Sequence, residues 1–206
     1  MRNSKLFLVG FGLLLVGALG ITLYASKVEA GITGTDHDLS GKGWGTNQIC
    51  IFCHTPHNAK TDLPAVPLWN HTTTTASFTP YSSPTLTATV GQPDGNSKAC
   101  LSCHDGATAI DAFQGNSGSH FMTGAKMLGT DLSNDHPISF TYDAALATAD
   151  GGLVTPASAS LVVAGIPLYS AKLQCGSCHN VHDNTNDPFL RISNGGSALC
   201  LKCHNK

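Results

Sequence analysis

The stretch CIFCHTPH at residues 50–57 places two histidines behind a pair of cysteines that stand three positions apart. The C-x-x-C-H core recurs at residues 100–104, 175–179 and 200–204, and the four copies use all 8 cysteines. C-x-x-C-H is the attachment signature of c-type haem, so the sequence predicts four covalently bound haem c groups. The predicted thioether residues are Cys50, Cys53, Cys100, Cys103, Cys175, Cys178, Cys200 and Cys203, and the predicted proximal iron ligands are His54, His104, His179 and His204.

Paired cysteines have two other common uses in proteins. C-x-x-C pairs also build zinc sites, and the 8 cysteines of an exported chain could form disulfides. Neither alternative requires a histidine directly behind every pair. The haem interpretation is therefore favoured.

The first 30 residues have the form of a secretory signal peptide. Arg2 and Lys5 precede an uncharged apolar run at residues 6–23, and residues 28–30 resemble a cleavage site. Cleavage would leave Gly31 as the N-terminus, although the apolar run is also long enough for an uncleaved anchor. We expect an exported protein, located at the cell surface or in an extracellular filament, or alternatively in the periplasm.

Composition favours loops over regular structure. The chain has 11 basic and 13 acidic residues, a balance that argues against a nucleic-acid partner. Its many aspartate, serine, threonine, glycine and proline residues favour caps and turns. We expect mostly irregular coil with short helices beginning at Ser97 and Ser197, one small β-hairpin over residues 161–169, and the haem stack as the core.

An internal repeat divides the part after the signal peptide into two modules, residues 31–120 and 121–206, within one compact domain. Each module has the order DH[DP][LI]S, then C-x-x-C-H-x-x-H, then S-x-x-C-L-x-C-H. Between the two motifs, PLWN at residues 67–70 weakly matches PFLR at residues 188–191. The sequence therefore predicts two haems in each module.

The repeat also indicates the distal iron ligands. His57 and His182 each lie three residues behind a motif histidine, too close to reach the far face of the same porphyrin, so we expect each to bind a different haem. His37 and His136 complete the repeated set. His71 and His120 have no counterpart in the other module and are weaker candidates. Bis-histidine ligation lacks the rise in potential that a methionine ligand gives, so low-potential, low-spin haems are expected.

These motifs resemble the multihaem cytochromes with doubled C-x-x-C-H of anaerobic, metal-respiring bacteria. The chain's size, its four motifs and its GTDHDLS opening at residues 34–40 are most similar to the outer-surface tetrahaem cytochromes that polymerise into nanowires. The resemblance implies one continuous haem stack, bis-histidine irons, and one distal histidine supplied by a neighbouring copy, for which His37 is the candidate. It also implies upstream periplasmic or outer-membrane cytochromes and extracellular electron acceptors as partners.

Three classes of function follow from these features. The first is an electron conduit, either a filament subunit or a soluble periplasmic carrier. The second is a haem reductase, which needs an iron with an open face, and the third is an electron-donating subunit of a reductase. Six further histidines for four irons make an open face unnecessary, so the conduit is expected and catalysis is not.

Overall fold

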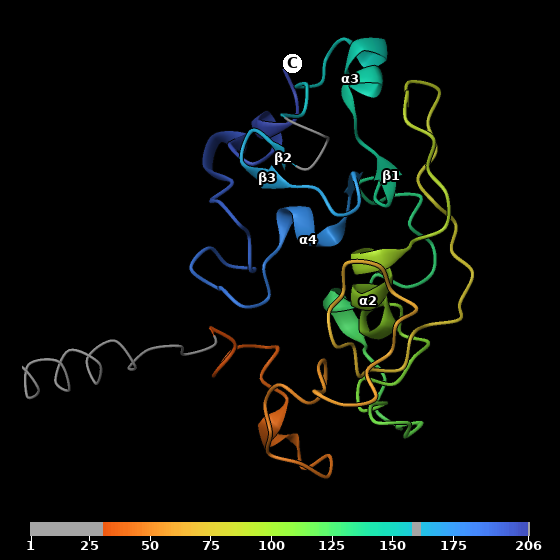
Figure 1. Cartoon of the computed structure of the whole chain (residues 1–206), viewed down its shortest axis with the longest axis vertical. Coiled ribbons are helices and arrows are strands. Elements are labelled where there is room, and N and C mark those ends of the chain that lie inside the picture. Colours follow the sequence, from red (N-terminus) through yellow and green to blue (C-terminus); the bar gives the residue numbers. More distant parts are fainter. Residues whose placement is uncertain (1–30, 158–161, 206) are drawn as a thin grey trace, which may run out of the picture. The chain divides into compact units, whose positions relative to one another are not determined.

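Short helices joined by long loops make up most of the described chain (Figure 1). The computed structural model describes residues 31–157 and 162–205. The longest helix, α2, carries the second C-x-x-C-H motif, and α4 carries the cysteines of the third. The α-helices and 3₁₀ helices (η) are, in chain order, η1 Ser40–Lys42, α2 Gly95–His104, η2 Gly124–Lys126, α3 Ala144–Asp150, α4 Cys175–Cys178, η3 Gly195–Ser197 and η4 Cys200–Lys202.

The described strands form two antiparallel pairs, and each strand is two residues long. β2 (Val162–Val163) pairs with β3 (Ile166–Pro167), with Val163 opposite Ile166. This pair confirms the expected hairpin, although its first residue, Leu161, lies outside the described residues. The second pair joins β1 (Phe140–Thr141) to β4 (Lys172–Leu173) and was not predicted, because such short strands leave no periodic pattern.

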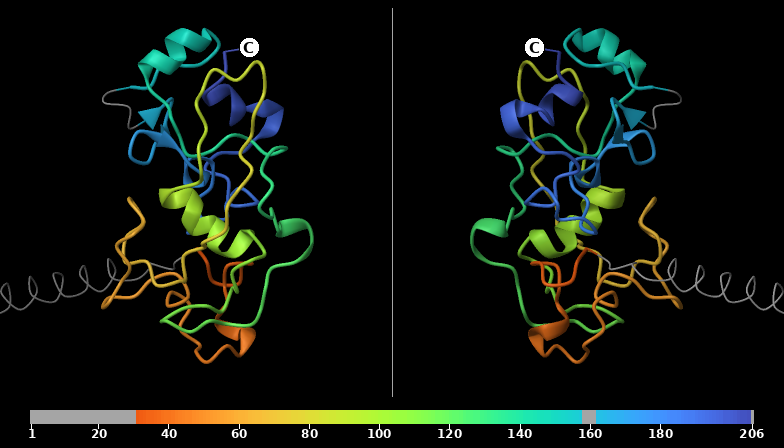
Figure 2. Two further views of the ribbon diagram at one scale, coloured as in Figure 1. Left: turned by 90° about the vertical axis from the view of Figure 1, so that its right-hand side faces the viewer. Right: turned by 90° about the vertical axis from the view of Figure 1, so that its left-hand side faces the viewer.

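The largest apolar cluster of the described chain lies between the third motif and α3. A long loop of the first module, at residues 72–94, lies beside α3 in both views of Figure 2. Thr87 on this loop donates its hydroxyl to Asp150 at 3.0 Å, and Ala88 and Val90 pack on the cluster. The two modules therefore interlock through this loop. The buried members of the cluster are Phe140, Tyr142, Ala147, Val163, Ile166, Leu168 and Leu173.

The start of α2 differs from the prediction. The helix begins at Gly95, with Asp94 at the N-cap position, and Ser97 lies inside it, fully buried. The Asp94 side chain makes no cap hydrogen bond because its carboxylate binds Lys172 and Gln174 instead. Ser197 is likewise the last residue of η3, not an N-cap.

The buried Ser97 ties the second motif to the third. Its hydroxyl accepts the backbone N–H of Cys175 at 2.9 Å, and its own N–H donates to the Gln174 side chain at 3.1 Å. Ser139 donates its hydroxyl to the same Gln174 oxygen at 3.0 Å. Gly176 completes this polar junction, since a Cβ there would collide with the side chain of Asn96. The junction holds α2 against α4.

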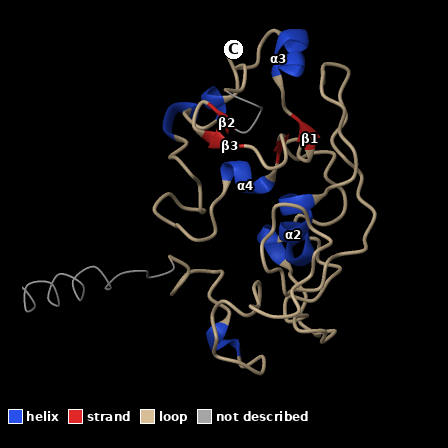
Figure 3. Ribbon diagram, viewed as in Figure 1, coloured by secondary structure: helices blue, strands red, loops and turns tan. Residues whose placement is uncertain are grey.

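The fold class is confirmed, because loops far exceed helices and strands in the described chain (Figure 3). Residues Gly31–Lys206 group as one unit. The predicted signal peptide, residues 1–30, lies outside the described residues. Among the helices that are described, none is long and apolar enough to cross a bilayer.

Removing the Ser97 hydroxyl should destabilise the protein. In Ser97→Ala, the buried N–H of Cys175 loses its acceptor, which costs about 1–3 kcal/mol of unfolding free energy. Chemical unfolding of the holoprotein, followed by circular dichroism, measures this loss. Ser82→Ala, at an exposed serine, serves as the control and should leave the unfolding midpoint in place. Equal midpoints for both variants would contradict the role given to the junction.

Candidate functional site

A loop at residues 67–70, which we call the first clamp loop, holds the first motif. It fixes the ring of the motif histidine and binds the backbone on both sides of the second cysteine. The hydrogen bonds run from His54 Nδ1 to Pro67 O (2.9 Å), from Thr55 N to Leu68 O (2.9 Å), from Asn70 N to Cys53 O (2.9 Å), and from the Asn70 side-chain amide to Ile51 O.

The loop at residues 188–191, the second clamp loop, holds the third motif in the same way. Each hydrogen bond has the counterpart that the repeat assigns to it. They run from His179 Nδ1 to Pro188 O (3.0 Å), from Asn180 N to Phe189 O (2.7 Å), from Arg191 N to Cys178 O (2.9 Å), and from Arg191 Nε to Gly176 O (2.7 Å).

Backbone conformation confirms that the two clamp loops are equivalent. Leu68 and Phe189, the second residues of the loops, have φ values of 55° and 59°. Such left-handed conformations are uncommon for residues other than glycine. A weak match of letters between PLWN and PFLR thus corresponds to a shared and detailed geometry.

Hydrogen bonds to backbone carbonyls also indicate which ring nitrogen of three motif histidines is free to bind a metal. Nδ1 of His54, His104 and His179 lies 2.8–3.0 Å from the carbonyl oxygen of Pro67, Lys126 and Pro188, respectively. A carbonyl can only accept, so Nδ1 carries the proton and Nε2 keeps its lone pair. A metal-binding histidine usually has this arrangement, with its other nitrogen donating to a carbonyl.

Three motif histidines each face a second histidine from a distant part of the chain. The ring centres are 6.2 Å apart for His37 and His104, 6.1 Å for His54 and His182, and 6.4 Å for His136 and His204. Two imidazoles that bind one metal ion from opposite sides, each at about 2 Å, place their ring centres roughly 6 Å apart. The separations of the three pairs therefore match that of two imidazoles bound to one metal ion.

His37 packs against other parts of its own chain. Its ring is 4.7 Å from Phe189 and next to His104. Burial lowers the pKa of His37, and the nearby His104 lowers it further. Its Nδ1 is buried without a hydrogen-bond partner among the described residues, which is unusual unless another group binds there. Within the described residues, His104 is the motif histidine whose ring His37 contacts.

His57 and His179 remain without a second histidine. Both are exposed, and neither ring makes a close contact with another imidazole in the part of the chain that the structure describes, although His179 lies near enough to His37 to help lower the pKa of that residue. The polar contacts of His57 involve its backbone, which bonds with the Thr55 hydroxyl. The motif histidine His179 and the candidate distal histidine His57 are therefore both accessible at the surface.

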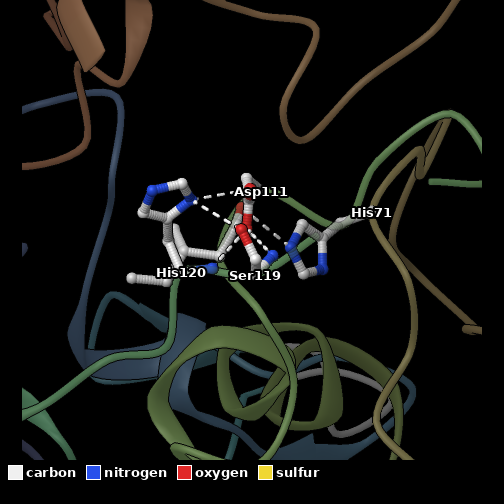
Figure 4. Close-up of polar contacts among 5 residues, drawn as sticks. His71, Asp111, Ser119 and His120 are labelled. Carbon is white, nitrogen blue, oxygen red and sulfur yellow. Dashed lines mark hydrogen bonds and ion pairs between the residues drawn. The ribbon is translucent and has the colours of Figure 1, made fainter. Parts of the chain in front are cut away.

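His71 is buried beside the second motif. It is 1% exposed, with Nδ1 2.8 Å from Thr72 O and Nε2 3.1 Å from Ile110 O (Figure 4). Burial lowers the pKa of His71, so the ring is neutral and donates only one N–H. Its Nε2 also lies 3.5 Å from the sulfur of Cys103, an attachment cysteine of the second motif.

His120 lies on the other side of Asp111 from His71 (Figure 4). Its Nδ1 is 2.8 Å from an Asp111 oxygen, and its side chain is 54% exposed. Burial acts to raise the pKa of Asp111, but hydrogen bonds from His120 and Ser119 lower it to about 2. The ring also contacts Trp44 at 4.9 Å. His120 is thus oriented by a carboxylate, and no motif histidine stands opposite it.

The attachment cysteines of successive motifs are close to one another. The pKa of Cys100 is raised, first by its hydrogen bond to Cys175 and then by burial. Burial also raises the pKa of Cys103, with a further contribution from Cys53. Burial likewise raises the pKa of Cys203 to about 11, with a contribution from Cys178. The motifs therefore follow one another in space in sequence order.

Residues 169–206, which contain the third and fourth motifs, match the family model described as the doubled CXXCH motif. No curated protein matches the chain. The family match supports a multihaem c-type cytochrome that acts in electron transfer. The CXXCH motifs accordingly indicate covalently bound haem c, with the cysteines holding the porphyrin and the histidines its iron.

Sequence reasoning identified the motif histidines and their candidate partners but not the groups that orient them. The clamp loops gave only a weak repeat, and Lys126 contributes a backbone carbonyl, which any residue type provides. Asp111 has no motif around it. Hydrogen bonds from backbone groups leave little trace in a sequence.

The histidine pairs predict which substitutions change the spin state of a haem. In His136→Ala, the iron bound by His204 loses its second ligand and should become high-spin. His71→Gln, which keeps a donor for the backbone carbonyls, should leave every haem low-spin. Electron paramagnetic resonance of the oxidised proteins distinguishes the two outcomes. An unchanged spectrum for His136→Ala, or a new high-spin signal for His71→Gln, would contradict the pairing.

Proposed function

We propose that the chain is a tetrahaem c-type cytochrome that conducts electrons along closely spaced bis-histidine haems and polymerises into an extracellular nanowire. Upstream periplasmic or outer-membrane cytochromes supply the electrons, and extracellular acceptors receive them. The proximity of cysteines in successive motifs supports short steps between haems, since their thioethers join the porphyrin edges to the chain. Catalysis at an open iron is not part of the proposal.

The repeat gives two rules for the distal ligands. By the first rule, the histidine of the DH[DP][LI]S element faces the C-x-x-C-H histidine at the end of its own module, as His37 faces His104 and His136 faces His204. By the second rule, the trailing histidine of one module faces the first motif of the preceding module, as His182 faces His54. Both modules obey the first rule within the chain.

His57 is the trailing histidine of the first module. We propose that the module preceding it belongs to another copy, so that the second rule is completed between chains. The partner of His57 under the same rule is His179, whose ring makes no close contact with another imidazole in the described structure; His37, which lies near it, has its ring contact with His104. We therefore assign His57 as the ligand that one copy supplies to the haem at His179 of the next.

The exposure of both His57 and His179 is the observation that carries this proposal. A ligand and its iron that belong to different copies must both reach the surface before assembly. The neighbouring Pro56 is also exposed, so no buried structure has to open for the contact to form. A head-to-tail contact of this kind does not close on itself, and it generates a filament.

The alternative is a protein that completes its fourth haem without a second copy, as a soluble carrier or a donor subunit would. His120 is the residue that supports this alternative, because Asp111 orients its ring at the surface. The two assignments predict opposite results for the same pair of variants.

His57→Ala should leave four haems attached, convert one of them to high spin, and prevent filament formation. His120→Ala is the matched control and should form filaments with four low-spin haems. Intact mass counts the haems, electron paramagnetic resonance reports the spin states, and negative-stain imaging reports assembly. Filaments from His57→Ala would refute the assignment, and a high-spin haem in His120→Ala instead would make the protein a self-contained carrier.

A further inference from the structure

The two clamp loops have the same geometry but end in chemically different residues. The first ends in Asn70, whose neutral amide donates to the carbonyl of Ile51. The second ends in Arg191, whose guanidinium Nε donates to the equivalent carbonyl, that of Gly176, at 2.7 Å. The repeat thus places a charge at one motif where the other has none.

The charge of Arg191 stays close to the haem-attachment cysteines. Gly176 lies between Cys175 and Cys178, so the guanidinium is bonded to the backbone that carries both thioethers. Its Nη2 donates to the Tyr169 hydroxyl at 2.8 Å, which holds the group in place from the other side. The side chain is half-buried. Its position is therefore fixed.

No carboxylate neutralises this charge within the described residues. The ion pairs found there join Lys172 to Asp94 and His120 to Asp111, and neither involves Arg191. The partners of Arg191, a carbonyl and a phenol, are both uncharged. A guanidinium also remains protonated at every pH the protein meets. The positive charge at the third motif is therefore permanent.

We infer that Arg191 positions the third motif and raises the reduction potential of the haem attached there. This inference rests on the proposed electron-conducting function. Reduction converts Fe(III) to Fe(II) by one electron, which a neighbouring Fe(II) haem gives up as it becomes Fe(III). No proton or covalent bond changes. A nearby positive charge stabilises the added electron, and the low dielectric of a partly buried site strengthens the effect.

The consequence is an uneven chain of haems. In a filament of identical copies, the haem at the third motif of every subunit would be reduced more readily than the same haem beside a neutral residue in place of Arg191. His57, which is proposed to bridge two copies, is the distal ligand assigned to this same haem. The charge would therefore set the electron population at the junction between subunits.

Exchanging the clamp residues tests the inference on the full holoprotein. Arg191→Asn gives the second clamp loop the chemistry of the first, Asn70→Arg makes the reverse change, and Arg191→Lys keeps a charge without the guanidinium fork. Spectroelectrochemical titration measures the haem potentials. In Arg191→Asn, the reduction potential of one haem should fall by about 59 mV, which is a tenfold shift of a one-electron equilibrium toward the oxidised form. In Asn70→Arg, the reduction potential of one haem should rise.

A purely structural role predicts a different pattern. Arg191→Asn and Arg191→Lys would then lower the melting temperature together and leave the potentials of all components where they are. Unchanged potentials in Arg191→Asn, with four haems still attached by intact mass, overturn the inference. An equal downward shift in Arg191→Lys also overturns it, because that variant keeps the charge. Haem count and filament formation in the parent protein test the proposed function separately.

Discussion

A histidine three residues behind a motif histidine cannot reach the opposite face of the same porphyrin, and this constraint organises the rest of the molecule. If the trailing histidines are iron ligands, as proposed, every C-x-x-C-H-x-x-H segment serves two haems. His182 obeys the constraint by facing His54 from more than half the chain away. Once one segment serves two haems, the haems must be neighbours. The spacing of two histidines thus translates directly into a short distance for electron transfer.

Holding such a segment in place requires fixed imidazoles, and backbone carbonyls provide them. The clamp loops and the carbonyl of Lys126 each hold one motif histidine through Nδ1, leaving Nε2 for iron. The polar junction around Ser97 then joins the second and third motifs, and the loop at residues 72–94 joins the modules. A chain with so little regular structure is stabilised by these specific contacts and by the haems that the motifs indicate.

The sequence predicts the parts that depend on local spacing. The coil-rich fold, the hairpin at β2 and β3, and the haem-attachment motifs all follow from composition, turn residues or fixed intervals. It does not predict the parts that depend on distant partners. Ser97 has the pattern of an N-cap, yet its hydroxyl accepts from Cys175, 78 positions away. His37 lies in a short motif near the start of the described chain, and nothing in that motif indicates that its ring packs against Phe189 beside His104.

In the proposed assembly, the repeat leaves one ligand bond to be made between copies. High-resolution imaging of the native assembled protein reveals this bond, because it shows both axial ligands of every iron. His57 of one copy and His179 of the next are expected to bind the same iron, while the other three irons are ligated within one chain. Two ligands from a single chain on every iron, or a protein that remains monomeric, would contradict this proposal.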